Sequence, residues 1–240
     1  MEKNNTKQEI LDTALELFSV QGFEATSIFQ IADAVGIRKA SVYSHFGSKQ
    51  ELLEALQEQV LEKYQKHSVF AKANWDDPAY TKKKQAMTPD AVIQMLQNHV
   101  HYILHDPQIC RARKMLTIEQ FRNPQLAALQ TKQNYTDVLN YCTGLMRFLM
   151  EQGTLMRGDA EIMAAQFCLP ISAWIALCDR EPEREDEAMT LMERHIRQFF
   201  RLYQGQEAVR KHGFAGRTGK TRCYDPKTRE KRKAVWSIFA

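Results

Sequence analysis

The segment from residue 26 to residue 49 constrains the fold of this chain more than any other. Two short helical patterns meet there at a single glycine, Gly36. The second pattern places Val42 and Phe46 four residues apart, on one face of a helix. The first pattern gathers its apolar residues on one face as well, at Ile31, Ala32 and Val35. Such a short helix, tight turn and second helix predict a helix-turn-helix.

Capping residues predict helices on both sides of this segment. Thr6 with Glu9 predicts a capping box for a helix over 6–20, which Gly22 ends. Thr26 or Ser27 caps the helix before Gly36, and the helix after it spans 38–46. Ser48 with Glu51 then predicts a second capping box for a long helix over 49–70.

The polar residues of this segment suit contact with double-stranded DNA. Hydroxyls at a helix N-terminus suit a phosphate, and Arg38 and Lys39 are long enough to reach guanine edges or phosphates. The alternative is a merely solvated polar face, which is less expected for a whole set on one helix after a turn. The candidate DNA-contacting residues are Thr26, Ser27, Arg38, Lys39, Ala40, Ser41, Tyr43, Ser44, His45 and Lys49.

Two positions in the segment leave alternatives open. His45 suits a phosphate or carbonyl contact beside Phe46, and a pH sensor is the sharper, less expected reading. Ile28 and Phe29 are apolar early in the second helix, where they either pack on the first helix or touch sugars.

The rest of the chain predicts an all-α protein with a larger C-terminal helical bundle. Alternating strand-like patterns are nearly absent. Helix starts are expected at Thr88-Pro89, Asp106-Pro107, Asn123-Pro124 and Asp159, with a long helix over 124–152 and a last helix over 184–203. The expected parts are a DNA-binding domain (1–50), a connecting helix (51–70), a ligand-binding and dimerisation domain (71–204) and a basic tail (205–240). Within the third part, residues 71–87 are expected to form a linker or mobile loop.

Charge and cysteine content narrow the class further. The net charge is +4, but residues 1–204 carry 23 basic and 26 acidic groups, so DNA attraction must come from local clusters. Five scattered cysteines predict buried free thiols, with a redox switch as the less expected alternative. The polar N-terminus does not resemble a signal peptide, and no apolar stretch approaches the ~20 residues that cross a bilayer, so we expect a cytoplasmic protein.

The motif order resembles the TetR/AcrR-type (tetracycline-repressor-like) transcription regulators. The likeness is strongest over residues 6–56 and weaker at Gly153–Asp159. It is carried by Gly22-Phe23, Ala25-Thr26-Ser27, Ile31-Ala32, Ala34-Val35-Gly36-Ile37, Val42-Tyr43-Ser44-His45-Phe46, Ser48-Lys49 and Glu51-Leu52-Leu53. The resemblance implies that Tyr43 and Lys49 clamp the DNA backbone.

The resemblance also implies a homodimer that responds to a small molecule. In the family, the last two helices pair with those of a second copy. The candidate dimer residues on the corresponding helices of this chain are Phe167, Ile171, Trp174, Met192, Ile196, Phe199 and Phe200. The middle helices enclose a pocket, for which the candidate lining residues are Met95, His99, Tyr102, Met115, Phe121, Tyr141, Leu145 and Phe148. The alternative for the last two helices is the core of a single chain, and both can be true because helices this apolar can bury more than one face. The pocket residues suit an ordinary core equally well.

The expected function is thus a ligand-responsive repressor of unknown effector. The alternative is a DNA-binding adaptor whose second domain binds a protein. A cavity of several hundred Å³ favours the regulator and a fully packed bundle favours the adaptor.

The sequence shows no catalytic triad, phosphate loop or cofactor motif, so neither an enzyme nor a cofactor is expected. His101 and His105 are spaced for a metal, but no cysteine or carboxylate stands at matching spacing, so we expect a solvated face. The tail is either a basic arm that adds non-specific DNA affinity or sequence without function.

Overall fold

The computed structural model describes residues 2–68, 70, 73–75, 77–82 and 87–205 of this chain. Among these residues every regular element is a helix, and the β pairing is limited to one isolated bridge between Leu155 and Gln204. The all-α prediction is therefore confirmed. Both the predicted basic tail, except for Gly205, and Cys223 lie outside the described residues.

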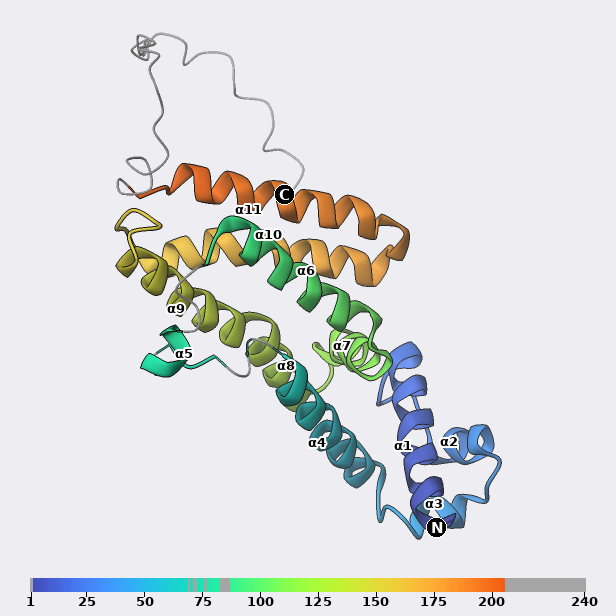
Figure 1. The fold of residues 1–240 in the computed structure, drawn as a ribbon. Helices are drawn as coiled ribbons and strands as arrows, with labels where there is room; N and C mark the ends of the chain where they lie inside the picture. The colour runs from blue at the N-terminus through green and yellow to red at the C-terminus, as the bar shows by residue number, and fades with distance from the viewer. Residues whose placement is uncertain (1, 69, 71–72, 76, 83–86, 206–240) are drawn as a thin grey trace, which may run out of the picture.

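Four helices build the N-terminal part: α1 (Glu2–Gln21), α2 (Ile28–Val35), α3 (Lys39–Tyr43) and α4 (Lys49–His67). They lie at one end of the molecule, and α4 runs from there back toward the bundle (Figure 1). The expected cap at Thr6 is wrong, because α1 already begins at Glu2 and Thr6 lies inside it. The fourth helix ends at His67 rather than at residue 70, because Ser68 adopts an extended conformation.

Local capping explains the turn between α2 and α3. The Ser27 hydroxyl accepts a hydrogen bond from Gln30 N at 3.2 Å, and the Gln30 side chain accepts one from Ser27 N at 2.8 Å. Gly36 then adopts φ +77°, a left-handed conformation that costs glycine little. Of the two predicted caps, Thr26 or Ser27, the structure uses Ser27, and the predicted glycine turn at Gly36 is present.

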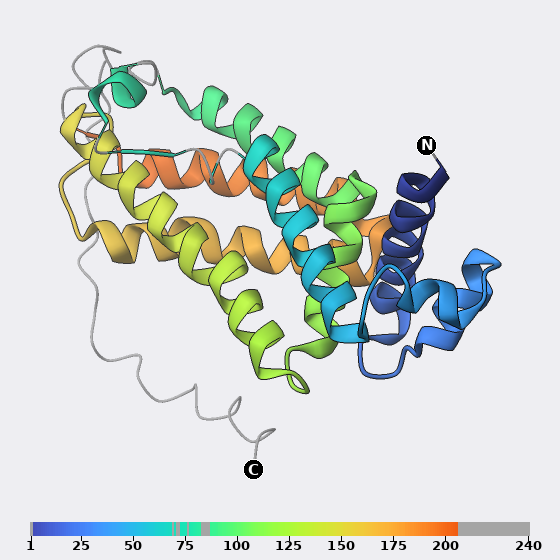
Figure 2. The same cartoon turned by 90° about the horizontal axis from the view of Figure 1, so that it is seen from below.

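The larger bundle contains α5 (Pro78–Lys82), α6 (Pro89–His105), α7 (Pro107–Glu119), α8 (Pro124–Thr131), α9 (Asp137–Glu151), α10 (Ala160–Arg180) and α11 (Glu185–Leu202). The predicted helix starts are confirmed, because Thr88, Asp106, Asn123 and Asp159 each accept backbone hydrogen bonds at the first turn. Figure 2 shows α10 and α11 running side by side, with α9 and α4 crossing in front of them.

Two predicted segments differ in detail. The long helix over 124–152 contains a π-helical turn at Lys132–Thr136, between α8 and α9. The predicted linker over 71–87 holds the short helix α5, and its Trp75 ring packs 5.4 Å from the Tyr141 ring. A tryptophan buries apolar area well even in a poorly patterned segment, which explains why Trp75 lies against the bundle.

Two apolar cores hold the molecule together. The first joins α1, α2, α3 and the start of α4 to α7, through residues such as Phe18, Leu52 and Met115. The second joins α6, α9, α10 and α11, around Val100, Met146 and Ile196. Because α7 belongs to the first core yet follows α6 directly, it connects the N-terminal helices to the bundle.

One helix of the described residues, α10, is long and apolar enough to cross a membrane by length and composition. The expectation that no stretch approaches this length was therefore wrong for α10. This helix packs against α9, α11 and α6, and one third of its tested window is buried. Its remaining apolar surface faces outward, at residues including Ile162 and Leu169.

Candidate nucleic-acid interface

The α2–α3 unit presents its polar residues outward because its apolar residues anchor it inward. Val42 and Phe46 are fully buried against α1, α2 and α4, and Ile31 and Ala32 are buried beside them. That anchoring leaves the opposite face of α3 in solvent. Arg38, Lys39, Ala40, Tyr43 and Ser44 are exposed, and Ser41 and His45 are half-buried.

The second helix of this unit is shorter than predicted. It spans five residues, Lys39–Tyr43, instead of residues 38–46. Arg38 occupies the capping position with an extended backbone, and its carbonyl accepts Ser41 N–H at 2.8 Å. The Lys39 ammonium lies 5.7 Å from the centre of the Tyr43 ring. Two cations therefore stand at the N-terminal end of an exposed helix, where recognition helices make their base contacts.

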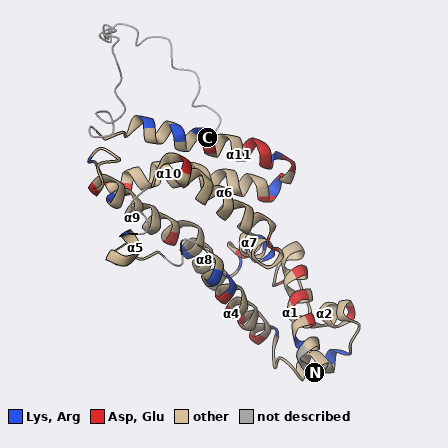
Figure 3. Cartoon of the chain, viewed as in Figure 1, with Lys and Arg blue, Asp and Glu red and all other residues tan. Residues whose placement is uncertain are grey.

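Figure 3 shows how local this positive charge is. Basic residues mark the loop from α2 into α3, whereas acidic residues lie along α1. A mildly acidic body with a basic tip agrees with the expectation that DNA attraction comes from named residues rather than from bulk charge.

Thr26 is not available as a phosphate contact through its side chain, which corrects the prediction. The residue is 1% exposed. Its hydroxyl donates to Gly22 O at 2.7 Å and accepts from Gln21 Nε2 at 3.0 Å. It therefore ties the end of α1 to the start of α2. Its neighbour Ser27 is exposed and remains a candidate contact.

Lys49 also has a structural role instead of the predicted clamp. Its ammonium group donates to the carbonyl oxygens of Phe23, Glu24 and Thr26 at 2.8, 3.3 and 3.0 Å. It also lies 4.3 Å from the centre of the Phe23 ring. A lysine has three ammonium hydrogens, so this arrangement uses all of them within the protein. We therefore assign Lys49 to the loop between α1 and α2.

Ile28 and Phe29, the two apolar residues at the start of α2, lie in different environments. Ile28 is buried in the first core, as one alternative required, whereas Phe29 is 65% exposed. Phe29 lies two residues after Ser27 on the same helix. It is thus an apolar surface residue beside the candidate interface.

Glu119 is a residue of this region that sequence reasoning missed. It lies at the end of α7 and is fully buried, and its Oε1 accepts a long hydrogen bond from Glu24 N at 3.4 Å. A Cβ atom at Gly22 would lie 2.4 Å from the same Oε1, so the glycine allows this close approach. No local pattern signals such a contact, because 95 residues separate Glu24 from Glu119.

A cavity of about 160 Å³ lies inside the bundle. Four of the predicted pocket residues line it, namely Met95, His99, Tyr141 and Leu145. Its other walls come from α4, α7, α10 and the π-helical turn, which contributes Gln133 and Asn134. Both Cys142 and Cys168 also line it, as buried free thiols of the kind that was predicted.

The other four predicted pocket residues lie elsewhere. Phe121 is 91% exposed, and Met115 belongs to the first core on the far face of α7. The Tyr102 ring lies beside His67, 5.6 Å between ring centres. Phe148 packs against Trp75 and lines a separate surface groove. These assignments were wrong because residue type does not say which face of a helix points inward.

The residues that line the cavity include two charged side chains, Arg113 and Asp179, and one imidazole, His99. Arg113 on α7 and Asp179 on α10 form a paired ion contact, with nitrogen–oxygen distances of 2.6 and 3.2 Å and both side chains largely buried. His99 is buried against the Phe70 ring, 4.2 Å between centres, and its Nδ1 has no partner among the described residues. Burial, with the nearby positive charge of Arg113, lowers the pKa of His99 to about 4. The imidazole is therefore neutral at physiological pH.

Most predicted dimer residues are buried within one chain. Phe167, Ile171, Met192, Ile196, Phe199 and Phe200 are all at most 7% exposed and belong to the second core. As surface contacts these six were wrong. Trp174 is half-buried and lines a shallow outer groove between α10 and α11, together with Leu191, His195 and Gln198. The exposed apolar residues Ile162, Leu169 and Leu202 lie on the same two helices.

Sequence comparison finds relatives of the N-terminal part. Residues 10–56 match the profile described as "Bacterial regulatory proteins, tetR family". The HTH-type transcriptional regulator AcrR of Shigella flexneri is 44% identical over 57 residues, which cover 24% of this chain and 26% of that protein. The negative transcriptional regulator IcaR of the biofilm operon in Staphylococcus aureus is 46% identical over 48 residues, or 20% of this chain and 26% of IcaR. The chain thus matches about a quarter of the length of these curated relatives.

Structural comparison extends the likeness to the whole fold. A transcriptional regulator from Saccharomonospora viridis, solved in complex with choline, superposes with a TM-score of 0.58 at 16% identity. The superposition covers 85% of this chain and 99% of that one. Residues 10–56 of this chain thus match the tetR family of bacterial regulatory proteins, and the superposition shows that the chain shares the fold of the Saccharomonospora viridis protein.

Proposed function

We propose that this protein is a homodimeric transcriptional repressor, and not an enzyme, that acts in the cytoplasm and releases its operator when a small molecule enters the bundle. The observation that carries the proposal is the exposed row of donors on α3, held outward by buried Val42 and Phe46. Repression, rather than activation, is supported by the relation to IcaR, a negative regulator.

Two copies are needed for tight and selective binding. A single helix-turn-helix reads one half-site, and dimers of this kind place two recognition helices about 34 Å apart. The outer face of α10 and α11 offers the apolar surface for pairing, including Leu169 and Trp174. The two chains would then present two copies of α3 to one palindromic site.

The DNA experiment uses variants whose side chains are exposed. The protein is first used to select its operator from random duplexes, and affinities are then measured at physiological salt. Arg38→Ala is expected to lose about 1–3 kcal/mol and to relax the preference at one base pair if its contact is bidentate. Tyr43→Ala is expected to weaken binding to all sequences alike, because a phosphate contact carries no sequence information. Unchanged affinity in both variants would show that α3 is not the recognition helix.

The cavity indicates the kind of effector. Its volume of about 160 Å³ resembles engineered cavities of about 150 Å³ that bind benzene. The lining is mainly apolar, and neutral His99 offers one unpartnered ring nitrogen. We therefore propose an uncharged molecule about the size of one substituted ring, with a polar group that meets His99. The choline complex of the Saccharomonospora viridis protein supports ligand binding in such a fold.

The adaptor remains the second candidate, because typical ligand pockets are larger, about 300–1,000 Å³. Phenol and related single-ring compounds separate the two functions in a binding and operator-release assay. The repressor predicts that some of them release the DNA, and that Leu145→Phe, which fills the cavity, still binds operator but no longer responds. If no compound that binds in the cavity releases the DNA, the adaptor is favoured.

A further inference from the structure

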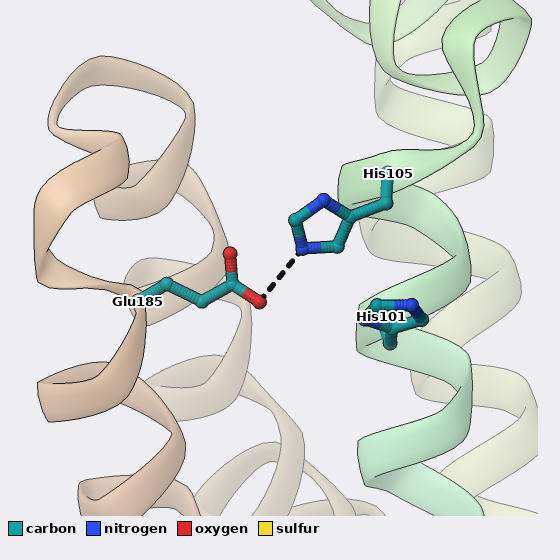
Figure 4. Close-up of side chains that lie close together, drawn as sticks. All are labelled: His101, His105 and Glu185. Carbon is teal, nitrogen blue, oxygen red and sulfur yellow. Dashed lines mark hydrogen bonds and ion pairs between the residues drawn. The ribbon is translucent and has the colours of Figure 1, made fainter.

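Three potential metal ligands meet at one end of the bundle, where α6 ends and α11 begins. They are His101 and His105 of α6 and Glu185 of α11, and their ligating atoms all lie within 4.8 Å of one another. Figure 4 shows His105 of α6 directed at the Glu185 carboxylate of the neighbouring helix, with His101 one turn away on α6. We propose that this cluster binds a divalent metal ion of the zinc class.

The sequence argued against a metal site because no cysteine or carboxylate stands at matching spacing to His101 and His105 along the chain. The fold brings the Glu185 carboxylate to them. His101 and His105 are four residues apart and therefore share a helix face, with 4.5 Å between their ring centres. Eighty residues further along the chain, Glu185 approaches until its Oε1 lies 2.9 Å from His105 Nε2. Two imidazoles and a carboxylate are a known zinc ligand set, in which water takes the fourth position.

The distances allow a metal with little movement. Ligand atoms bound at about 2.0–2.1 Å in a tetrahedral site lie roughly 3.3 Å apart. The His105–Glu185 pair is slightly closer than this at 2.9 Å, and all three ligand atoms lie within 4.8 Å of one another. Because both imidazoles are exposed and Glu185 is only half-buried, side-chain rotation can close the remaining gap without rearranging a core.

The charges around the cluster favour a cation. Glu185 begins α11 and is followed by Asp186 and Glu187, so three acidic residues stand in the first turn. The nearby Arg184 guanidinium donates hydrogen bonds to Glu181 and Glu187, whereas Glu185 is hydrogen-bonded to His105. Imidazole ligands select transition metals over Mg²⁺ and Ca²⁺, which prefer oxygen. We therefore expect Zn²⁺ and Co²⁺ to bind and Mg²⁺ not to compete.

A bound ion would fasten α6 to α11 next to the α6–α7 joint. Asp106 follows His105 directly, caps α7 and forms an ion pair with Lys63 of α4 at 2.7 Å. The metal would therefore stabilise the folded bundle, since the site exists only when these helices are packed together.

The first test titrates Zn²⁺ and Co²⁺ into the full-length protein, stripped of metal and without a histidine tag. The parent is expected to bind one equivalent that is lost, or at least tenfold weaker, in His101→Ala, His105→Ala and Glu185→Gln, because even outer-shell changes weaken metal sites 10–100-fold. Glu185→His keeps three ligands and is expected to retain binding. The visible absorption of Co²⁺ reports whether the site is tetrahedral.

Matched controls separate this site from another exposed histidine and from a neighbouring exposed carboxylate. His67→Ala removes an exposed histidine at the end of α4, and Glu183→Gln removes an exposed carboxylate two residues before Glu185. Both are expected to bind like the parent. If the three site variants bind as tightly as these controls, or if the parent binds no metal, the proposal is wrong.

A second readout is thermal. Zn²⁺ is expected to raise the melting temperature of the parent and of His67→Ala but not that of His105→Ala, and EDTA is expected to reverse the rise. Equal shifts in the parent and His105→Ala would overturn the proposal. No measurement here uses DNA, so failure of the metal site and failure of the proposed repressor are distinguishable.

Discussion

A polar residue in a DNA-binding motif can serve the protein itself instead of the DNA. Thr26 and Lys49 illustrate this at the scale of single residues. Both hold the loop between α1 and α2, since Lys49 donates to three carbonyls there and Thr26 donates to Gly22 O. Such hydrogen bonds position α2, and α2 positions α3. A loss of DNA affinity on substitution therefore has two possible origins, which stability measurements separate.

Lys49→Met is expected to destabilise the fold. Hydrogen bonds from a charged donor contribute about 1.5–3 kcal/mol, so we expect a loss of roughly that size in the free energy of unfolding, measured by urea denaturation. Lys66→Met is the control, because Lys66 is exposed and its ion pair with Glu62 at 3.0 Å lies on the surface of one helix, where such pairs contribute little stability. Unchanged stability with weakened DNA binding would instead restore Lys49 as a phosphate clamp.

His99 is expected to make stability depend on pH. Its pKa is about 4 in the folded protein and about 6.5 when unfolded, so folding favours the neutral ring. The stability is therefore complete above pH 6.5 and decreases as the pH falls toward 4, by up to about 3 kcal/mol. His99→Leu is expected to flatten this part of the stability profile relative to the parent. Parallel profiles for the two proteins would contradict a neutral, buried His99.

At the scale of elements, α7 is the part that touches both halves of the molecule. Its Ala112, Met115 and Leu116 belong to the N-terminal core, and Glu119 reaches Glu24 N beside Gly22. From the same helix Arg113 crosses to Asp179 of α10 at the cavity wall. A ligand that altered this ion pair would act on a helix already packed against α1, which offers a physical route to the DNA-binding helices.

The ion pair itself can be tested by a double-mutant cycle. Arg113→Met leaves Asp179 buried without its partner and is expected to cost about 3–5 kcal/mol of unfolding free energy. Asp179→Leu is expected to cost a similar amount. The double variant is expected to recover part of the loss, because an apolar pair leaves no unpaired charge. Additive losses would show that the two residues do not depend on each other.

At the scale of the whole molecule, the unexplained surface is the outer face of α10 and α11. Ile162, Leu169 and Leu202 are 40–64% exposed on these two adjacent helices. The same helices bury their other faces in the second core. Each helix thus has apolar residues on two sides, as expected when one side packs within the chain and the other against a second copy.

If the proposed dimer pairs through this surface, Leu169→Asp is expected to convert it to a monomer. A buried, unpaired carboxylate at the pairing surface is costly, so light scattering should give a mass near 27.9 kDa instead of twice that value. Operator affinity should fall with it. Phe121→Asp is the control, because Phe121 is exposed just after the end of α7 and belongs to neither α10 nor α11. A parent that is monomeric, or a variant that stays dimeric, would argue against this surface.

The sequence by itself determined the features that depend on residues within one or two helical turns. The caps at Ser27, Thr88 and Asp106, the left-handed Gly36 and the inward anchors Val42 and Phe46 were all predictable, because each involves neighbours a few positions apart. The same local rules place Arg38 and Tyr43 on the exposed side of α3.

Only the tertiary structure decided what each apolar face packs against and which distant polar groups meet. An apolar stripe shows that a face is buried but not by what, so Phe199 was predicted at a dimer surface and Met115 in the ligand pocket. Lys49 meets Phe23 O, Arg113 meets Asp179 and His105 meets Glu185 across 26, 66 and 80 residues. Chain folding sets such encounters through the packing of whole helices, and no short-range pattern records them.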